Sequence, residues 1–179
     1  MSEQNAVCPP FISQHSLSEE WAYRGCGLVA LKMVLDHWNL QDERNRTLPM
    51  GELLRSATLL GAYREGIGWS HSGLVEVAKS LGYDAFNRDL PKERPGNLPG
   101  DSLQILAEDV ANGPVLVSIW KNYDPEQKGG HIVVVYRVEE ERISLLDPEK
   151  RSEQEGRVEC LKKDFLHGYK MRSICVTPK

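Results

Sequence analysis

The longest run of hydrophobic positions in the sequence extends from Gly27 to Trp38, and its only polar residues are Lys32, Asp36 and His37. At helical spacing, apolar side chains then cover most of the circumference. A helix that is hydrophobic on so many sides is buried at the centre of its domain. The pattern therefore predicts a central helix in the N-terminal half of the chain.

Three further helices follow from hydrophobic periodicity and from residues that start or stop helices. Pro49 and Gly82 act as start and stop signals, and Asp101 with Gln104 forms a capping-box pattern. The predicted ranges are Pro49–Leu60, Ser70–Leu81 and Asp101–Asn112. The segment LPKERPGNLPG, residues 90–100, contains three prolines and two glycines, and it predicts a connection between two lobes.

After Pro114 the pattern changes to short runs of β-branched and apolar residues, which are typical of strands. The predicted strands are Val115–Trp120, Ile132–Val138, Arg142–Leu146, Arg157–Cys160 and Met171–Val176, with a short helix over Leu161–Leu166. Helices followed by antiparallel strands predict an α+β fold. The 179 residues suit a single domain. We expect a helical lobe over about residues 22–89 and a β lobe over about residues 101–177.

Composition and charge exclude several classes of protein. Lys and Arg number 22 against 26 Asp and Glu, a net charge of −4 with no basic cluster, which does not favour binding to nucleic acid or an anionic membrane. No run reaches the roughly 18 apolar residues of a membrane helix, and the opening MSEQNAV lacks the features of a signal peptide. We therefore expect a cytoplasmic protein. The four cysteines form no CxxC pair, so the spacing favours neither a disulfide framework nor a zinc site.

Cys26 is the first candidate for chemistry. It lies at the start of the central helix between Gly25 and Gly27. The positive end of a helix dipole favours the thiolate form and lowers the pKa of a thiol. The glycines leave room for a substrate backbone to approach. The alternative is a buried cysteine that acts as a small hydrophobic residue, which is our interpretation of the remaining cysteines, Cys8, Cys160 and Cys175.

A cysteine nucleophile needs an imidazole nearby, and His131 fits best among the five histidines. It follows Gly129 and Gly130 at the end of a polar loop and immediately precedes the most apolar predicted strand. A polar side chain at such a strand start is typical of a catalytic or edge residue. The remaining histidines are His15, His37, His71 and His167; of these, His71 opens a predicted helix and could also line a cleft.

Asp147 is the candidate partner of His131. The strands Ile132–Val138 and Arg142–Leu146 read as a hairpin that turns in the charged run Glu139–Glu141. A turn centred there places Asp147 beside His131 at the open end of the hairpin. A carboxylate in that position can accept a hydrogen bond from one imidazole nitrogen and leave the other for the thiolate. The alternative role for Asp147, which precedes Pro148, is a strand-ending turn residue.

Gln14 is a further candidate. A side-chain amide just upstream of the nucleophile can donate one hydrogen bond to an oxyanion, with the backbone N–H of Cys26 as the second donor. Spacing alone also allows an ordinary loop glutamine, because twelve positions separate Gln14 from Cys26.

Several stretches together resemble the papain-like cysteine peptidases, and within them the double-glycine, bacteriocin-processing peptidase family and its stand-alone relatives. These stretches are PPFISQHS, RGCGLVALKMVLDHW, GIGWSHSGLVEVAKSLGYDA, GPVLVSIW, GGHIVVVYRV and ISLLDP. The resemblance implies a papain-like fold with the site in a cleft between two lobes. It also implies Gln14 as the oxyanion residue, Cys26 as nucleophile, His131 as base and Asp147 as its orienting residue.

The function that we expect is therefore a thiolate peptidase acting on a peptide or protein, with no metal or organic cofactor. The same site can also perform acyl transfer or amide hydrolysis, because only the acceptor differs. A third alternative is a peptidase-shaped binding module without activity, which the presence of a candidate nucleophile disfavours. Family members fused to membrane transporters cleave leader peptides after two glycines, and this specificity is not transferred to a chain without a transporter segment.

Overall fold

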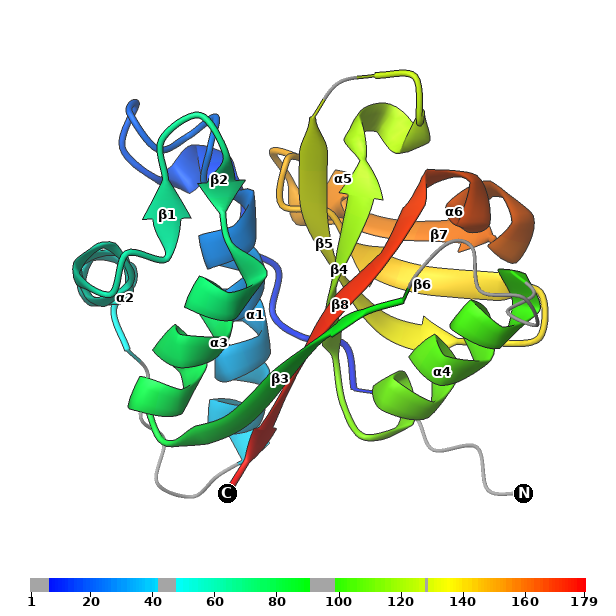
Figure 1. The fold of residues 1–179 in the computed structure, drawn as a ribbon, viewed down its shortest axis with the longest axis horizontal. Helices are drawn as coiled ribbons and strands as arrows, with labels where there is room; N and C mark the ends of the chain where they lie inside the picture. The colour runs from blue at the N-terminus through cyan, green and yellow to red at the C-terminus, as the bar shows by residue number, and fades with distance from the viewer. Residues whose placement is uncertain (1–6, 42–47, 91–98, 128) are drawn as a thin grey trace.

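The computed structural model describes residues 7–41, 48–90, 99–127 and 129–179, and Figure 1 shows its arrangement. Helices α1, α2 and α3 lie on one side of a six-stranded sheet, and α4 and α6 lie on the other. The helices are α1 (Cys26–Gln41), α2 (Met50–Leu59), α3 (His71–Ser80), α4 (Pro99–Ala111), α5 (Glu153–Gly156) and α6 (Lys162–Gly168), with 3-10 turns η1 (Gln14–Ser16) and η2 (Lys121–Tyr123).

The large sheet is antiparallel throughout, in the order β3-β8-β4-β5-β6-β7. Its strands are β3 (Tyr83–Asp89), β4 (Val115–Trp120), β5 (Gly130–Val138), β6 (Arg142–Leu146), β7 (Arg157–Leu161) and β8 (Tyr169–Pro178). A separate hairpin pairs β1 (Tyr63–Arg64) with β2 (Gly68–Trp69). Helices combined with an antiparallel sheet confirm the predicted α+β fold.

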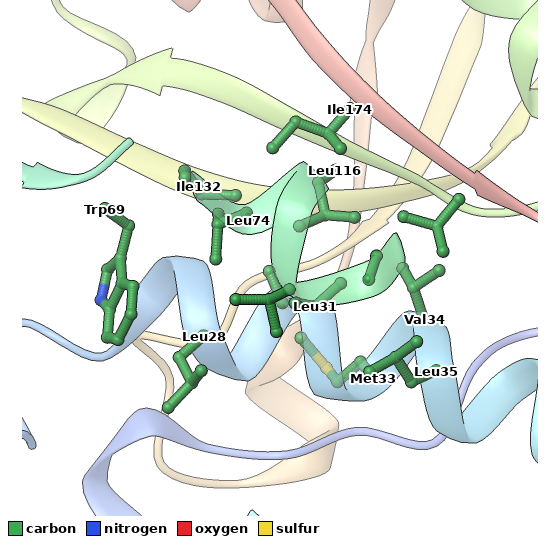
Figure 2. Packing of buried hydrophobic residues seen from close by; sticks show 14 of the residues in the cluster. Leu28, Leu31, Met33, Val34, Leu35, Trp69, Leu74, Leu116, Ile132 and Ile174 are labelled. Atoms are coloured by element: carbon green, nitrogen blue, oxygen red, sulfur yellow. The ribbon is translucent and has the colours of Figure 1, made fainter. Parts of the chain in front are cut away.

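Alternation along the strands gives the sheet two apolar faces, each covered by helices. On one face, α1 and α3 bury side chains against the sheet residues Leu116, Ile132 and Ile174 (Figure 2). On the other, α4 and α6 cover a second cluster that includes Val133, Val135 and the fully buried Phe165. The prediction of a central helix is confirmed, because residues Gly27 to Leu35 of α1 are all buried.

The hairpin register agrees with the prediction. Val134 pairs with Leu146 and Val135 with Leu145, the pairing that a turn near Glu140 requires, before the register shifts by one residue toward the turn. Extended beyond its outermost pair, Val134 with Leu146, this register indicates where the residues at the open end of the hairpin meet.

Some elements differ from the sequence-based expectation. The strand β3 was not predicted, because only Ala85 of its seven residues is buried and its apolar alternation is weak; it is held by backbone pairing along β8. Helix α4 begins at Pro99, so Asp101 lies within its first turn and does not cap it. Most of the predicted inter-lobe connection, residues 91–98, lies outside the described residues. Within the described ranges, no helix is long and apolar enough to cross a membrane.

Candidate active site

Cys26 is the first residue of α1, as the sequence predicts, and close packing fixes that end of the helix. A Cβ atom at Gly27 would lie 2.8 Å from Cβ of Trp69 and 3.1 Å from Cδ1 of Ile132. One at Gly25 would overlap Cδ1 of Leu17. Gly27 therefore lets the start of α1 pack closely against β2 and β5, and Gly25 lets the preceding turn pack against Leu17. These contacts are a structural reason for the two glycines beside the substrate access expected from the sequence.

The Cys26 thiol interacts with the side chain of His131, the second residue of β5. Burial on its own would raise the pKa of the thiol. The hydrogen bond and positive charge of His131, together with the backbone N–H groups of Ile132 and Gly27, outweigh burial and lower the pKa of Cys26 below its usual value. The contact therefore favours a thiolate.

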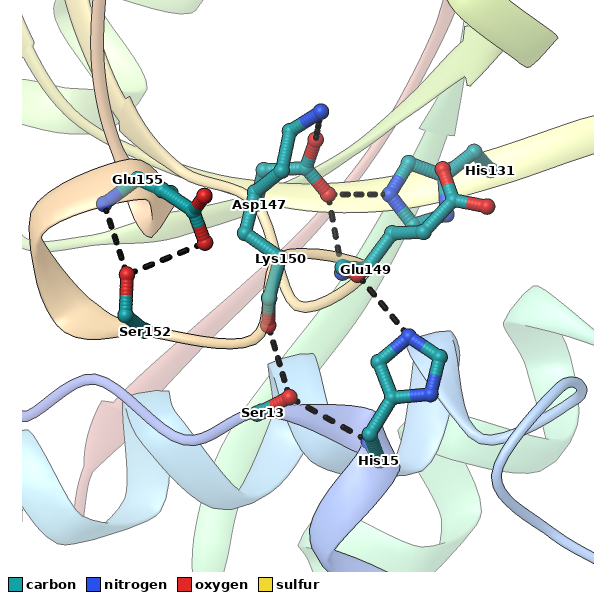
Figure 3. Close-up of polar contacts among 8 residues, drawn as sticks. All are labelled: Ser13, His15, His131, Asp147, Glu149, Lys150, Ser152 and Glu155. Carbon is teal, nitrogen blue, oxygen red and sulfur yellow. Dashed lines mark hydrogen bonds and ion pairs between the residues drawn. The ribbon is translucent and has the colours of Figure 1, made fainter.

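His131 is held on its other side by Asp147, the residue that follows β6 (Figure 3). Nε2 of His131 lies 2.6 Å from Oδ1 of Asp147, which also accepts the backbone N–H of Glu149 at 2.9 Å. Burial lowers the pKa of His131, but Asp147 and Cys26 together raise it to about 10. Both partners thus favour the imidazolium form.

Asp147 is itself arranged to stay ionised. Burial would raise the pKa of its carboxyl, and the bonds from His131 and the Glu149 N–H, with the charge of Lys150 4.0 Å away, lower it. The β5–β6 register puts His131 and Asp147 on the same face of the sheet as diagonal neighbours. The adjacency predicted from the hairpin is therefore present.

Gln14 belongs to η1 and is 4% exposed. Its Cβ lies 3.7 Å from the point where a Cβ of Gly25 would stand, so it neighbours the residue before Cys26. Oε1 of Gln14 is buried and has no hydrogen-bond partner among the described residues. The donor end of this amide is Nε2.

The long spacer between Gln14 and Cys26 is folded back by aromatic packing. The Trp21 ring lies 5.0 Å from the ring of Tyr63 and 5.6 Å from that of Trp69, and Nε1 of Trp69 donates to the carbonyl of Arg24 at 2.6 Å. These contacts tie the spacer to the β1–β2 hairpin, and so the distance in sequence does not separate the two residues in space.

Three hydrogen bonds that the sequence did not reveal connect η1 to the turn after Asp147. The backbone N–H of Gln14 donates to the carbonyl of Pro148 at 2.8 Å, and Oγ of Ser13 to that of Lys150 at 2.6 Å. His15 Nε2 donates to the carbonyl of Glu149 at 3.0 Å (Figure 3). Backbone acceptors leave no signal in side-chain patterning, so these roles of Ser13 and His15 were not predictable.

The remaining candidates are placed elsewhere. His71 bonds to Oγ of Ser118 at 2.6 Å, and burial, followed by the charge of Arg172, lowers its pKa to about 4. Cys8, Cys160 and Cys175 each have a raised pKa, mainly because of burial. Cys26 is therefore the one cysteine whose surroundings favour ionisation.

One group within the described ranges offers three possible metal ligands within 4.8 Å of one another: His131, Asp147 and Glu149. Nε2 of His131 and Oδ1 of Asp147 already share a hydrogen bond, which a metal bound to both would break. The atoms are thus arranged for proton sharing, and the geometry gives no support to a metal at this position.

Comparisons with known proteins reveal the fold and no close relative. No family model matches the chain, and no curated protein matches it. Similar solved structures include three peptidases. The peptidase domain of Streptococcus ComA, a bi-functional ABC transporter, has 18% identity and a TM-score of 0.61, covering 88% of this chain and 93% of its own.

The other two cover nearly the whole chain. A double glycine motif protease from an AMS/PCAT transporter, in complex with the leader peptide, has 16% identity and a TM-score of 0.64, over 99% of this chain and 96% of its own. A candidate C39-like peptidase from Bacillus anthracis has 19% identity and a TM-score of 0.65, over 98% and 95%. The chain therefore resembles the double-glycine peptidase domains and has their papain-like α+β fold.

Proposed function

We propose that this protein is a cysteine peptidase that uses Cys26 as its nucleophile. The observation that carries the proposal is the series Cys26–His131–Asp147. His131 is hydrogen-bonded to Asp147, the pKa of the thiol is lowered and that of the imidazole is raised. Such a pair is poised as thiolate and imidazolium, the form in which a cysteine attacks a carbonyl.

Each residue has a role in the proposed reaction. The Cys26 thiolate forms a bond to the carbonyl carbon, while the backbone N–H of Cys26 and Nε2 of Gln14 stabilise the oxyanion. His131 gives its proton to the leaving amine, and a thioester remains. His131 then takes a proton from the water molecule that hydrolyses the thioester, and Asp147 keeps its ring in place throughout.

The substrate that we propose is a peptide or an unstructured protein segment. One structure of the same fold holds a leader peptide, which supports a peptide ligand without assigning its sequence. The chemistry requires no metal or organic cofactor. All four cysteines are free thiols, which suits a reducing compartment, and we propose the cytoplasm as the location.

Acyl transfer is the second candidate, because a thioester on Cys26 can be released by an amine as well as by water. Incubation with a diverse peptide mixture, followed by mass spectrometry of new termini, separates the two. Hydrolysis gives new free carboxyl ends, and transfer gives joined peptides.

A matched pair of variants assigns the products to the site. Cys26→Ala is expected to abolish them, whereas Cys160→Ala, which removes a half-buried thiol on β7, is expected to leave them unchanged. If wild-type protein yields neither kind of product, the alternative of a peptidase-shaped binding module is favoured.

A further inference from the structure

The loop that leads from β4 into His131 begins with an unusual backbone. Asn122 and Tyr123 have φ values of 54° and 59°, so two consecutive residues with side chains adopt the left-handed conformation. Residues other than glycine rarely do so, and such strain persists only where the surroundings enforce it. The contacts of Tyr123 therefore indicate what holds its backbone in this conformation and where its side chain is placed.

The last residue of helix α6 contacts the backbone of Tyr123. A Cβ atom at Gly168, the last residue of α6, would lie 2.6 Å from Cα and 2.7 Å from Cβ of Tyr123, so the two backbones are in direct contact. The Tyr123 side chain packs against the apolar cluster on the α4/α6 face of the sheet. His131 and Asp147 lie at the end of this same face, because they continue the alternation of Val133 and Leu145.

The hydroxyl of Tyr123 is buried and has no hydrogen-bond partner among the described residues. Burial raises its pKa, and the next cause is the negative charge of Asp147, which places the hydroxyl within electrostatic reach of that carboxylate. A tyrosine retained for packing alone would be better replaced by phenylalanine, because a buried hydroxyl without a partner destabilises the fold.

Asp147 has an oxygen suited to receive this hydroxyl. Its Oδ1 accepts both Nε2 of His131 and the N–H of Glu149, whereas the described contact of Oδ2 is Nζ of Lys150 at 4.0 Å. That separation is longer than a hydrogen bond. A carboxylate held by one oxygen can still rotate, and a donor at Oδ2 would stop the rotation.

We infer that Tyr123 is a positioning residue of the proposed peptidase, a conclusion that rests on the proposed function. Its hydroxyl donates a hydrogen bond to one bridging water molecule, which in turn donates to Oδ2 of Asp147. The carboxylate is thereby held with Oδ1 aimed at Nε2 of His131. The strained loop and Gly168 serve to bring the hydroxyl to this place.

The test measures the reactivity of Cys26 and needs no substrate. Iodoacetamide alkylation is followed at each cysteine by mass spectrometry across a pH series, for wild type, Tyr123→Phe, Asp147→Ala and the double variant. Tyr123→Phe is expected to raise the pKa of Cys26 by about half a unit, because the imidazolium loses a well-aimed partner. The rate at Cys26 on the acidic side then falls about threefold.

The double variant distinguishes positioning from packing. In the Asp147→Ala background, Tyr123→Phe should have no further effect on Cys26, because the hydroxyl acts through Asp147. Tyr169→Phe is the matched control, since Tyr169 is a buried tyrosine of the same cluster whose hydroxyl bonds to Ser173. It is expected to leave the pKa of Cys26 unchanged.

An unchanged or lowered Cys26 pKa in Tyr123→Phe overturns the inference, as does an effect of equal size in the Asp147→Ala background. Failure of the proposed function is a different result: normal coupling among Tyr123, Asp147 and Cys26, with no product from any peptide.

Discussion

Burial alone would keep the Cys26 thiol protonated and the His131 imidazole neutral. Their contact, together with Asp147, reverses both preferences, because each charge is stabilised by its neighbour. In the proposed peptidase, reactivity thus depends on three side chains acting together, and the loss of one should change the ionisation of the others.

Asp147 provides a direct test of this ion pair. With His131 as imidazolium, both ring nitrogens already carry protons, so Asp147 needs only to accept a hydrogen bond. An asparagine carbonyl can do that, and we predict that Asp147→Asn lowers kcat/KM by less than about tenfold. Asp147→Ala, which frees the ring to rotate, should lower it clearly more. Equal damage from both variants would contradict the ion-pair mechanism.

In the proposed reaction, Gln14 acts at a later point, when the oxyanion forms. Gln14→Ala should lower kcat by about 10²-fold with little change in KM, because an oxyanion donor acts mainly in the transition state. The exposed Gln104 on α4 offers a control, and Gln104→Ala should leave kcat as it is. Full activity of Gln14→Ala would show that Gln14 is a buried loop residue without a role in stabilising the oxyanion.

The candidate residues were predictable because each occupies a special position in its element. Cys26 starts a helix, His131 starts a strand and Asp147 ends one, and all three positions can be read from patterning. The contacts of Gln14 were not predictable, because they depend on Trp21 folding the spacer back and on the carbonyl of Pro148. Tyr123 gave no signal, since its backbone conformation is set by α6.

At the scale of elements, close backbone packing limits which helices tolerate a larger residue. A Cβ atom at Gly73 in α3 would overlap Cα of Ala62, which follows α2, and would lie 2.6 Å from Oγ of Ser70. Gly51 in α2 has no atom within 4 Å of such a Cβ. The two helical glycines therefore form a matched pair.

We predict opposite effects for this pair. Gly73→Ala should lower the free energy of unfolding by about 1–3 kcal/mol, because α3 must move away from Ala62. Gly51→Ala should raise it by roughly 0.5 kcal/mol, because alanine is the better helix former. Denaturant unfolding of both variants measures the difference. A stabilising effect of Gly73→Ala would contradict the close packing of α3 against Ala62.

The helix and strands that carry the site could be predicted from the sequence. The edge strand β3 could not. The run Ile132–Val138 is recognisable as a strand, and its residues Ile132 to Val135 are buried on both faces. Strand β3 is mostly exposed and gains its conformation from pairing with β8, nearly ninety residues later in the chain. Non-local backbone pairing of this kind leaves no local pattern.

At the scale of the whole molecule, a partly buried hydrogen bond joins a helix to the sheet near the site. His71 on α3 bonds to Ser118 on β4, and it is surrounded by the charges of Arg172, Lys170 and Asp89. Burial and the two cations keep its imidazole neutral, with a pKa lowered to about 4. Protonation of His71 would therefore weaken the attachment of α3 to the sheet.

The pH dependence of stability follows from this lowered pKa. Between the usual histidine pKa and about 4, the unfolded chain binds a proton at His71 that the folded chain does not. The free energy of unfolding should therefore fall as the pH decreases through that window. After allowance for partial exposure, the loss is on the order of 1–2 kcal/mol. His71→Gln should flatten the curve in this window, and an identical curve for wild type and variant would contradict the assignment.

The central claim is that Cys26 is an ionised nucleophile held by His131, and site-resolved alkylation with iodoacetamide near neutral pH tests it most directly. We predict that Cys26 reacts at least about tenfold faster than Cys8, Cys160 or Cys175, whose thiols have raised pKa values. His131→Ala should remove this advantage. Equal rates at Cys26 and Cys8 in the wild-type protein, or an undiminished rate at Cys26 in His131→Ala, would contradict the account.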